Sequence, residues 1–81
     1  MQIEFSLDAQ EEYRALEPAL RKQAKKQFQY LLKDPRHTSL NVKKYDKSLD
    51  IWQGRINKSW RFYFHLVGDV YYVFKIKNHP K

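Results

Sequence analysis

Residues 51–80 read IWQGRINKSWRFYFHLVGDVYYVFKIKNHP, and this stretch decides the fold. Its middle part splits into two alternating sets of side chains: Trp60, Phe62, Phe64 and Leu66 in one, Arg61, Tyr63, His65 and Val67 in the other. Because a β-strand points alternate side chains to opposite faces, the pattern predicts a strand that buries the first set and presents the second. Gly68-Asp69 follows and predicts a tight hairpin turn, since Gly68 can adopt a positive φ.

The returning strand, residues 70–77, is expected to pair with this strand in one of two ways. A two-residue turn pairs Phe64 with Val73. The same register, continued without change, places Lys75 in the core. We therefore expect either a bulge near Phe74 or a longer turn to restore the parity, and the pattern does not choose between them.

The N-terminal segment predicts a short strand and then a helix. Residues 2–6 alternate apolar and polar side chains as a half-buried strand does. Asp8 and Glu11 have the spacing of a capping box, which favours the start of a helix at this point. The residues expected on the buried face of that helix are Ala9, Tyr13 and Leu16.

A second helix is predicted to begin at Pro18 and to end at Asp34-Pro35. Proline suits the first turn of a helix, and it disfavours helix at the residue before it. Between these limits one apolar stripe at helical spacing comprises Leu20, Ala24, Phe28, Leu31 and Leu32. We expect the two helices to form an antiparallel hairpin.

The remaining segments complete an α+β fold. Residues 36–41 predict a loop, and residues 42–45, 51–56 and 59–67 predict strands. The predicted order is β-α-α-β-β-β, with the helical hairpin packed on one face of a small, mostly antiparallel sheet. We expect residues 1–81 to form a single domain whose other sheet face is partly polar.

The composition favours a basic, cofactor-free protein. The 81 residues carry a formal net charge of +7, and the first 20 are net acidic, so the basic excess belongs to the rest. A basic domain attracts polyanions, although an acidic protein partner and a merely solvated lysine-rich helix face are alternatives. The sequence has no cysteine, no metal-ligand spacing and no phosphate-cradling glycine loop. It also lacks a leader-like segment and an apolar run of membrane length, so we expect no cofactor, no metal, no membrane partner and a cytoplasmic protein.

Five segments of the sheet region resemble the RelE/ParE superfamily of toxins from toxin–antitoxin systems. They are LNVKKY at 40–45, IWQGRI at 51–56, WRFYF at 60–64, GDV at 68–70 and the Asn78-His79 pair. The resemblance spans nearly the whole chain and implies a RelE-like fold and a cognate antitoxin as partner. For the RelE, YoeB, HigB and YafQ branches it implies cleavage of mRNA in the ribosomal A site.

Two other functions remain open under the same resemblance. ParE-like branches poison DNA gyrase and lack the nuclease residues. A relative that has lost its activity but still pairs with an antitoxin is the third possibility. The leading hypothesis is the endoribonuclease, with the ribosome and mRNA as partners, and these two functions are its alternatives.

The resemblance also implies roles for particular residues. Arg61 matches an arginine that faces the scissile phosphate, Arg55 matches a basic position on the preceding strand, and His79 matches a terminal histidine. Arginine binds phosphate oxygens in a fork, and histidine exchanges protons near neutral pH, so these three are the candidate catalytic residues. The candidates for RNA or ribosome binding are Lys43, Lys44, Lys47, Gln53, Tyr63, His65, Lys77 and Lys81.

Seven of these eleven residues also have an alternative explanation without function. Arg61 can form a cross-strand ion pair, and His79 can be an idle residue near the chain end. His65 can be an ordinary exposed strand residue, Tyr63 can be ordinary sheet packing, and the lysines at 43, 44 and 47 can be a solvated loop.

Overall fold

A computed structural model describes residues 1–79 of the chain. Within these residues the elements follow in the order β1 (Gln2–Phe5), α1 (Leu7–Arg14), α2 (Pro18–Lys33), the 3₁₀ helix η1 (Thr38–Leu40), β2 (Lys43–Asp46), β3 (Ile51–Arg55), β4 (Trp60–Val67) and β5 (Val70–Asn78). Four strands therefore follow the helices in the described part of the chain, one more than the predicted order contains. All four correspond to segments predicted as strands, residues 42–45, 51–56, 59–67 and 70–77, so the order β-α-α-β-β-β counts one strand too few; β2 pairs with β3 at the edge of the sheet.

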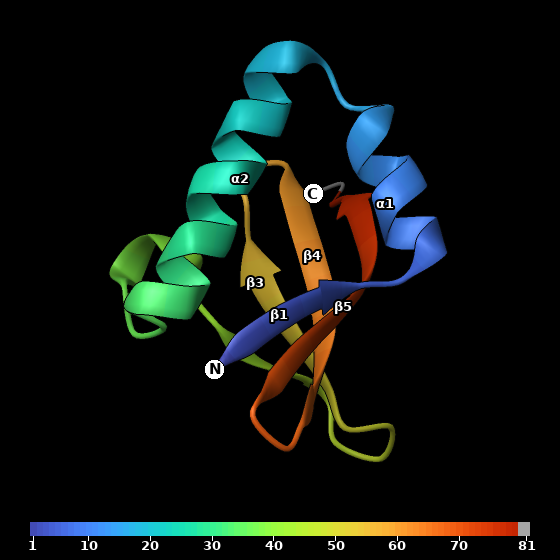
Figure 1. The fold of residues 1–81 in the computed structure, drawn as a ribbon. Coiled ribbons are helices and arrows are strands. Elements are labelled where there is room, and N and C mark those ends of the chain that lie inside the picture. Colours follow the sequence, from blue (N-terminus) through green and yellow to red (C-terminus); the bar gives the residue numbers. More distant parts are fainter. Residues whose placement is uncertain (80–81) are drawn as a thin grey trace.

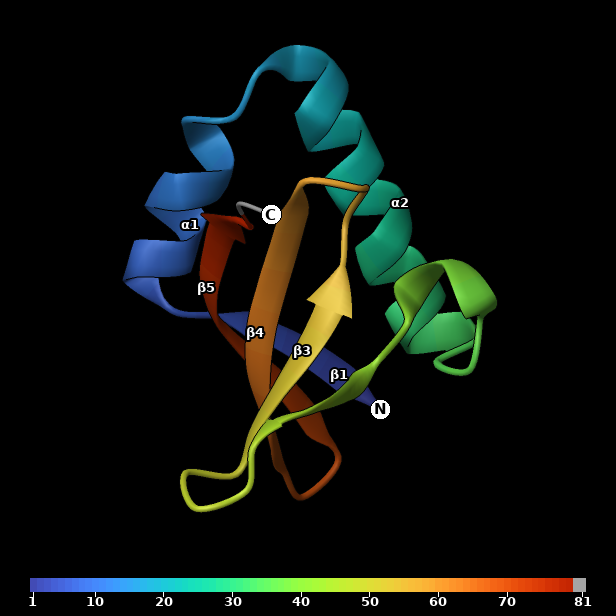
Figure 2. The ribbon, with the colours of Figure 1, turned by 180° about the vertical axis from the view of Figure 1, so that it is seen from behind.

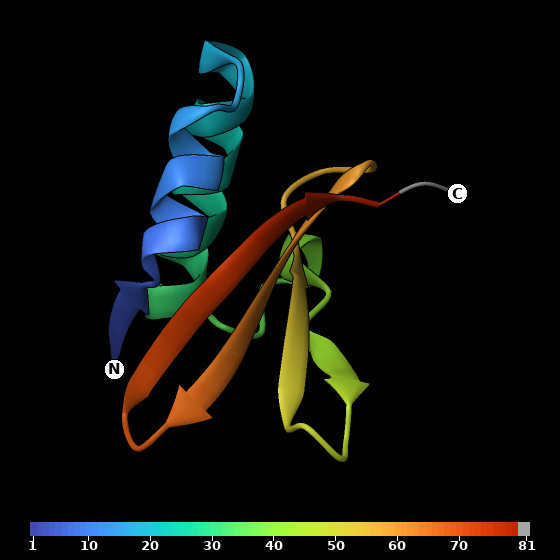
Figure 3. The ribbon, with the colours of Figure 1, turned by 90° about the vertical axis from the view of Figure 1, so that its right-hand side faces the viewer.

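The five strands of residues 1–79 form one sheet in the order β1-β5-β4-β3-β2 (Figure 1). The pairing of β1 with β5 is parallel, and the other pairings are antiparallel. Both helices lie on one side of the sheet, as the side view shows (Figure 3). The view from behind shows the other face, which no helix of the described residues covers (Figure 2). These observations confirm the predicted α+β fold.

The core lies between the helical layer and the sheet. Phe62 and Phe64 of β4 are 0% and 1% exposed, and the ring of Phe28 from α2 packs edge-to-face on Phe62 at 5.0 Å between centroids. Close packing continues on β3, where a Cβ added to Gly54 would lie 2.3 Å from the Phe62 ring. Glycine at position 54 therefore lets the Phe62 ring lie directly against the β3 backbone.

Of the two expected alternatives, a bulge near Phe74 and a longer turn, the structure has the bulge. Phe64 pairs with Val73, but the preceding residue of β4, Tyr63, pairs with Lys75, so Phe74 is the extra residue. The bulge turns Lys75 outward and brings Ile76, only 3% exposed, into the core. The hairpin turn before it contains Gly68 at φ 60°, as the turn prediction requires.

The helices differ from the prediction at one boundary. The N-cap of α1 is Ser6, whose hydroxyl accepts the Ala9 N–H at 3.0 Å, so the expected capping box at Asp8 is wrong. Ser6 has extended backbone and continues from β1, which places its hydroxyl beside the free N–H groups of the first turn. The second helix begins with Pro18 at its first position and ends before Asp34, as predicted.

Two predicted core positions are more exposed than expected. Leu32 and Leu66 are both 37% exposed. Leu66 lies next to the hairpin turn, where β4 extends beyond the helical layer (Figure 3). Conversely, Leu40 in the predicted loop 36–41 is fully buried, because the loop contains the 3₁₀ helix η1 and turns this side chain into the core.

Candidate functional site

A row of three cationic residues crosses the open face of the sheet. Arg55 of β3 lies opposite Arg61 of β4, and Arg61 lies opposite Lys77 of β5. Residues directly opposite one another on neighbouring strands point to the same face, and like charges placed in this way repel. A bound anion would remove that repulsion, so this row, called the cationic row below, is a candidate anion site.

No carboxylate compensates the cationic row in the described part of the chain. The ion pairs found within residues 1–79 are Lys44–Asp50 and Lys75–Glu12, and neither includes a member of the row. The Nε of Arg55 is buried without a hydrogen-bond partner among these residues. A buried, unpaired donor is costly, and an oxyanion is the kind of ligand that satisfies it.

The guanidinium of Arg61 is fixed by the turn between β3 and β4. Its Nη1 donates to the carbonyl oxygens of Asn57 at 2.6 Å, Lys58 at 3.2 Å and Trp60 at 3.0 Å. Burial, and then the positive charge of Arg55, lower the pKa of the Arg61 guanidinium, although an arginine stays cationic at neutral pH. Arg61 therefore forms no cross-strand ion pair within residues 1–79, and its contacts are with backbone carbonyls.

The backbone of Arg55 is held from behind by a buried glutamine. Gln27 of α2 is 5% exposed, and its Nε2 donates to the Arg55 carbonyl at 2.9 Å and to the Ser39 carbonyl at 3.3 Å. The sequence analysis missed this residue. Its signal is its position on the apolar face of α2, three residues after Ala24 and four before Leu31.

A groove of about 400 Å³ opens at the cationic row. Its lining residues are Asn41, Lys43, Lys44, Tyr45, Gln53, Arg55, Arg61 and His79. The N–H of His79 donates to the Ser59 carbonyl at 2.5 Å, which ties the end of β5 to the same turn that holds Arg61. The structure thus brings the three candidate catalytic residues to one groove; that they catalyse a reaction remains a prediction.

Of the other residues predicted to bind RNA, some lie at the groove or in the cationic row, and others lie toward the opposite end of the sheet. Lys43 and Gln53 line the groove as a cross-strand pair, and Lys77 is exposed in the cationic row. Lys44 borders the groove, but its ammonium group pairs with Asp50 and lies 4.4 Å from the centroid of the Trp52 ring. Lys81 lies outside the described residues.

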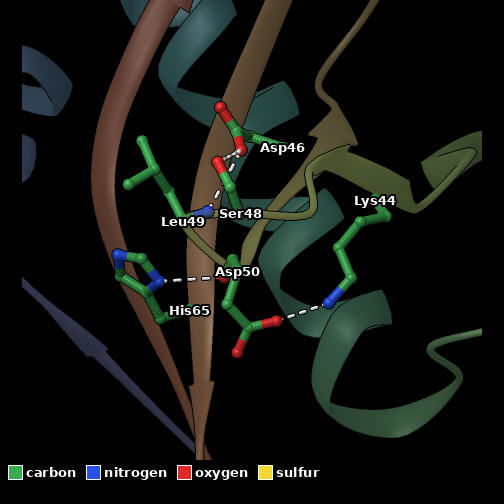
Figure 4. A network of polar contacts seen from close by, with 6 residues as sticks. All are labelled: Lys44, Asp46, Ser48, Leu49, Asp50 and His65. Atoms are coloured by element: carbon green, nitrogen blue, oxygen red, sulfur yellow. Dashed lines mark hydrogen bonds and ion pairs between the residues drawn. The ribbon is translucent and has the colours of Figure 1, made fainter.

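His65 and Lys47 lie toward the other end of the sheet, at the turn between β2 and β3. His65 Nδ1 bonds the Asp50 carbonyl at 3.0 Å in the network of Figure 4, and its ring stacks on Phe74 at 4.8 Å. Asp46 accepts hydrogen bonds from Ser48 and Leu49, which lower the pKa of its carboxyl group. Position 65 is four positions along β4 from Arg61, or about 13 Å, and neither His65 nor Lys47 is among the residues that line the groove.

Tyr63 is buried although the alternation pattern predicts it in the presented set, and the exposed aromatic ring beside it is that of Tyr45. Tyr63 is only 7% exposed, and burial, with a smaller effect of Tyr45, raises the pKa of its hydroxyl. Tyr45 packs edge-to-face against it at 4.9 Å and is itself 58% exposed. The sequence analysis gave Tyr45 no role, although its place two residues after Lys43 on a strand puts both on one face.

The helical side of the molecule has a groove of a different kind. It measures about 500 Å³ and is lined mainly by apolar side chains of β1 and the two helices, with Arg14 and Lys25 among its lining residues. Its lining residues include no histidine, and Arg14 and Lys25 are not cross-strand neighbours as the members of the cationic row are. Elsewhere in residues 1–79 there is no cluster of His, Asp or Glu that could hold a metal ion, and no helix there is long and apolar enough to cross a membrane.

Comparison of the sequence with protein-family models gives no match, and comparison with characterised proteins gives none either. The fold, in contrast, matches several solved structures over nearly the whole chain. The YoeB/ParE toxin from Agrobacterium tumefaciens is 14% identical with a TM-score of 0.79, and the match covers 99% of this chain and 100% of the toxin. A chain of the archaeal RelE-RelB complex from Pyrococcus horikoshii OT3 is 14% identical with a TM-score of 0.80, covering 99% and 96%.

The isolated E. coli RelE toxin is a further match, at 21% identity and a TM-score of 0.76, covering 99% of this chain and 85% of RelE. At such low identities these comparisons establish the fold. They confirm that the chain has the fold of the RelE-, YoeB- and YafQ-type toxins, as the resemblance in its sheet segments implies.

Proposed function

We propose that this protein is a RelE-type toxin that cleaves mRNA in the ribosomal A site and that a cognate antitoxin neutralises it. The observation that carries the proposal is the cationic row of Arg55, Arg61 and Lys77, which has no carboxylate partner within residues 1–79 and whose two arginines line a groove together with His79. RNA supplies a phosphate for the row, and the RelE-like fold supports the assignment. A ribosome-directed toxin acts in the cytoplasm.

The groove offers groups suited to cleavage by internal attack. The 2′-hydroxyl of a ribose attacks the adjacent phosphorus, the bond to the 5′-oxygen of the next nucleotide breaks, and a 2′,3′-cyclic phosphate and a 5′-hydroxyl form. Arg55 and Arg61 would stabilise the additional negative charge on the phosphoryl oxygens in the transition state. The His79 imidazole would either accept the 2′-hydroxyl proton or donate a proton to the leaving 5′-oxygen.

The proposed antitoxin would place an acidic or amphipathic segment across the cationic row. The net charge of +7 favours such a partner, and the fold is shared with a toxin in the intact E. coli RelBE toxin-antitoxin complex. Tight co-purification with the product of a neighbouring gene is the expected result. Absence of a complex at micromolar concentrations would count against a toxin–antitoxin pair.

The decisive experiment is single-turnover cleavage of A-site mRNA on programmed ribosomes with Arg55→Ala. Loss of a transition-state cation should slow cleavage on the order of a hundredfold. Arg14→Ala is the matched control, because it removes the same charge from the exposed surface of α1 in the helical layer. An Arg55→Ala protein that folds and cleaves at the wild-type rate would show that the groove is not the site.

Induction in cells separates the ribosome from gyrase as the target. The proposal predicts that incorporation of radiolabelled methionine falls soon after induction, without an early DNA-damage response. Normal translation together with an induced damage response would instead favour a ParE-like action on gyrase.

A further inference from the structure

We infer that Tyr45 is a nucleobase-stacking site at the edge of the groove, so that the protein holds its RNA by a base as well as by a phosphate. This inference rests on the proposed function, because it assigns a second contact to the same substrate. Tyr45 lines the groove together with Arg55 and Arg61. Tyr45 is 58% exposed, and among the exposed large hydrophobic side chains of residues 1–79 it is the only aromatic one.

Tyr45, although exposed, packs against a second aromatic ring. Its ring meets that of Tyr63 at an interplanar angle of 68° and a centroid distance of 4.9 Å. Tyr63 is 7% exposed and belongs to the central strand β4, so it supports Tyr45 from a rigid part of the sheet. An aromatic ring held on one side and open on the other stacks on a base with little loss of side-chain entropy.

The position of this pair matches the cationic row. Tyr63 lies two residues from Arg61 on β4, which is about 7 Å along the strand. A nucleotide whose phosphate binds at Arg61 can therefore reach Tyr45 with its own or an adjacent base. Lys43, which lines the same groove as Tyr45, adds a cation for the neighbouring phosphate.

Tyr63, in contrast, has little ring surface left for a base. The residue predicted to stack from the strand alternation lies beneath Tyr45, and the exposed aromatic surface belongs to the edge strand instead. Stacking on an aromatic side chain tolerates any base, since every base has a π-face. The inferred ligand is thus a nucleobase of single-stranded RNA, and we expect this stacking site not to discriminate among the four bases.

The test uses programmed ribosomes whose A-site codon carries 2-aminopurine at each position in turn and 2′-O-methyl groups that prevent cleavage. Stacking quenches 2-aminopurine fluorescence, so wild-type protein should quench it at one position. Tyr45→Leu should abolish that quenching and weaken binding about 10- to 100-fold. Tyr45→Phe keeps the ring and should behave as wild type.

The outcomes separate the inference from the function on which it rests. If Tyr45→Leu binds and quenches as wild type does, the stacking site is wrong while the proposed function survives. If the wild-type protein does not bind programmed ribosomes at all, the proposed function fails and the inference fails with it. Circular dichroism checks that Tyr45→Leu is folded, which its exposed position favours.

Discussion

The Nη1 of Arg61 lies 2.6 Å from the carbonyl oxygen of Asn57, four residues earlier in the chain. The same nitrogen also bonds the carbonyls of Lys58 and Trp60, so Arg61 closes the turn between β3 and β4. Arg61 is thus both a member of the cationic row and a support of the turn that carries it. Substitutions at this position should change stability as well as activity.

Arg61→Ala should lower the free energy of unfolding by about 1–2 kcal/mol, because several carbonyl hydrogen bonds of the turn lose their donor. Arg61→Lys keeps a cation and can keep part of this bonding, so it should lose less stability. Urea denaturation measures both. Arg55→Ala is the comparison, since it removes a cation of the same row whose Nε has no partner in the described residues.

In cleavage assays Arg61→Ala should be at least as slow as Arg55→Ala, on the order of a hundredfold below wild type. The assay has to be run at a temperature where circular dichroism shows the variant folded. An Arg61→Ala protein with wild-type stability would contradict the role in the turn. One with the wild-type cleavage rate would contradict the role at the phosphate.

Gln27→Ala should lower the free energy of unfolding by about 1–3 kcal/mol, because partly buried hydrogen bonds to the carbonyl groups of Arg55 and Ser39 lose their donor. The control is Gln29→Ala, an exposed glutamine on the same helix, which should change stability by less than 0.5 kcal/mol as surface substitutions usually do. Chemical denaturation compares the two. Equal stability of both variants would show that Gln27 does not hold the end of β3.

The sequence predicts those features that depend on neighbours along the chain. Strand alternation from 60 to 67 predicts the buried Phe62 and Phe64, and the parity conflict at Lys75 predicts either a longer turn or the bulge that the structure has at Phe74. Both follow from the period of a single strand and its hairpin partner. The meeting of Arg55 and Arg61 follows in the same way, because a short turn connects their strands.

The features that the sequence did not predict depend on contacts between distant segments. Gln27 looks like any polar helix residue until Ser39 and Arg55 are placed beside it. Tyr45 gains its place only when β2 pairs with β3 and its ring reaches Tyr63 of β4. Periodicity in one segment contains no information about such partners.

Gly54→Ala should lower the free energy of unfolding by about 1–3 kcal/mol, because the added Cβ would lie 2.3 Å from the Phe62 ring and force the core to shift. Gly68→Ala is a comparison with a different cause. Nothing lies within 4 Å of a Cβ added at Gly68, but the φ of +60° at this position disfavours alanine. Gly68→Asn should be tolerated better than Gly68→Ala, since asparagine adopts this conformation more readily.

Thermal unfolding and near-ultraviolet circular dichroism distinguish the two glycines. Gly54→Ala should change the near-ultraviolet spectrum, which reports the packing of aromatic rings such as Phe62, whereas Gly68→Ala should leave the spectrum unchanged. An unaltered spectrum and stability for Gly54→Ala would contradict the close contact between β3 and Phe62.

His79→Gln tests the proton carrier of the proposed reaction. Glutamine keeps some hydrogen bonding but cannot exchange protons, so cleavage should slow by roughly a hundredfold. Stability should stay the same, because the bond to Ser59 uses the His79 backbone N–H, which the variant retains. His65→Gln is the matched control and should cleave at the wild-type rate, since His65 lies at the β2–β3 turn and not in the groove. If His79→Gln cleaves normally while Arg55→Ala does not, the phosphate site stands and another group moves the proton. A slow His65→Gln beside a normal His79→Gln would place that group at the opposite end of β4.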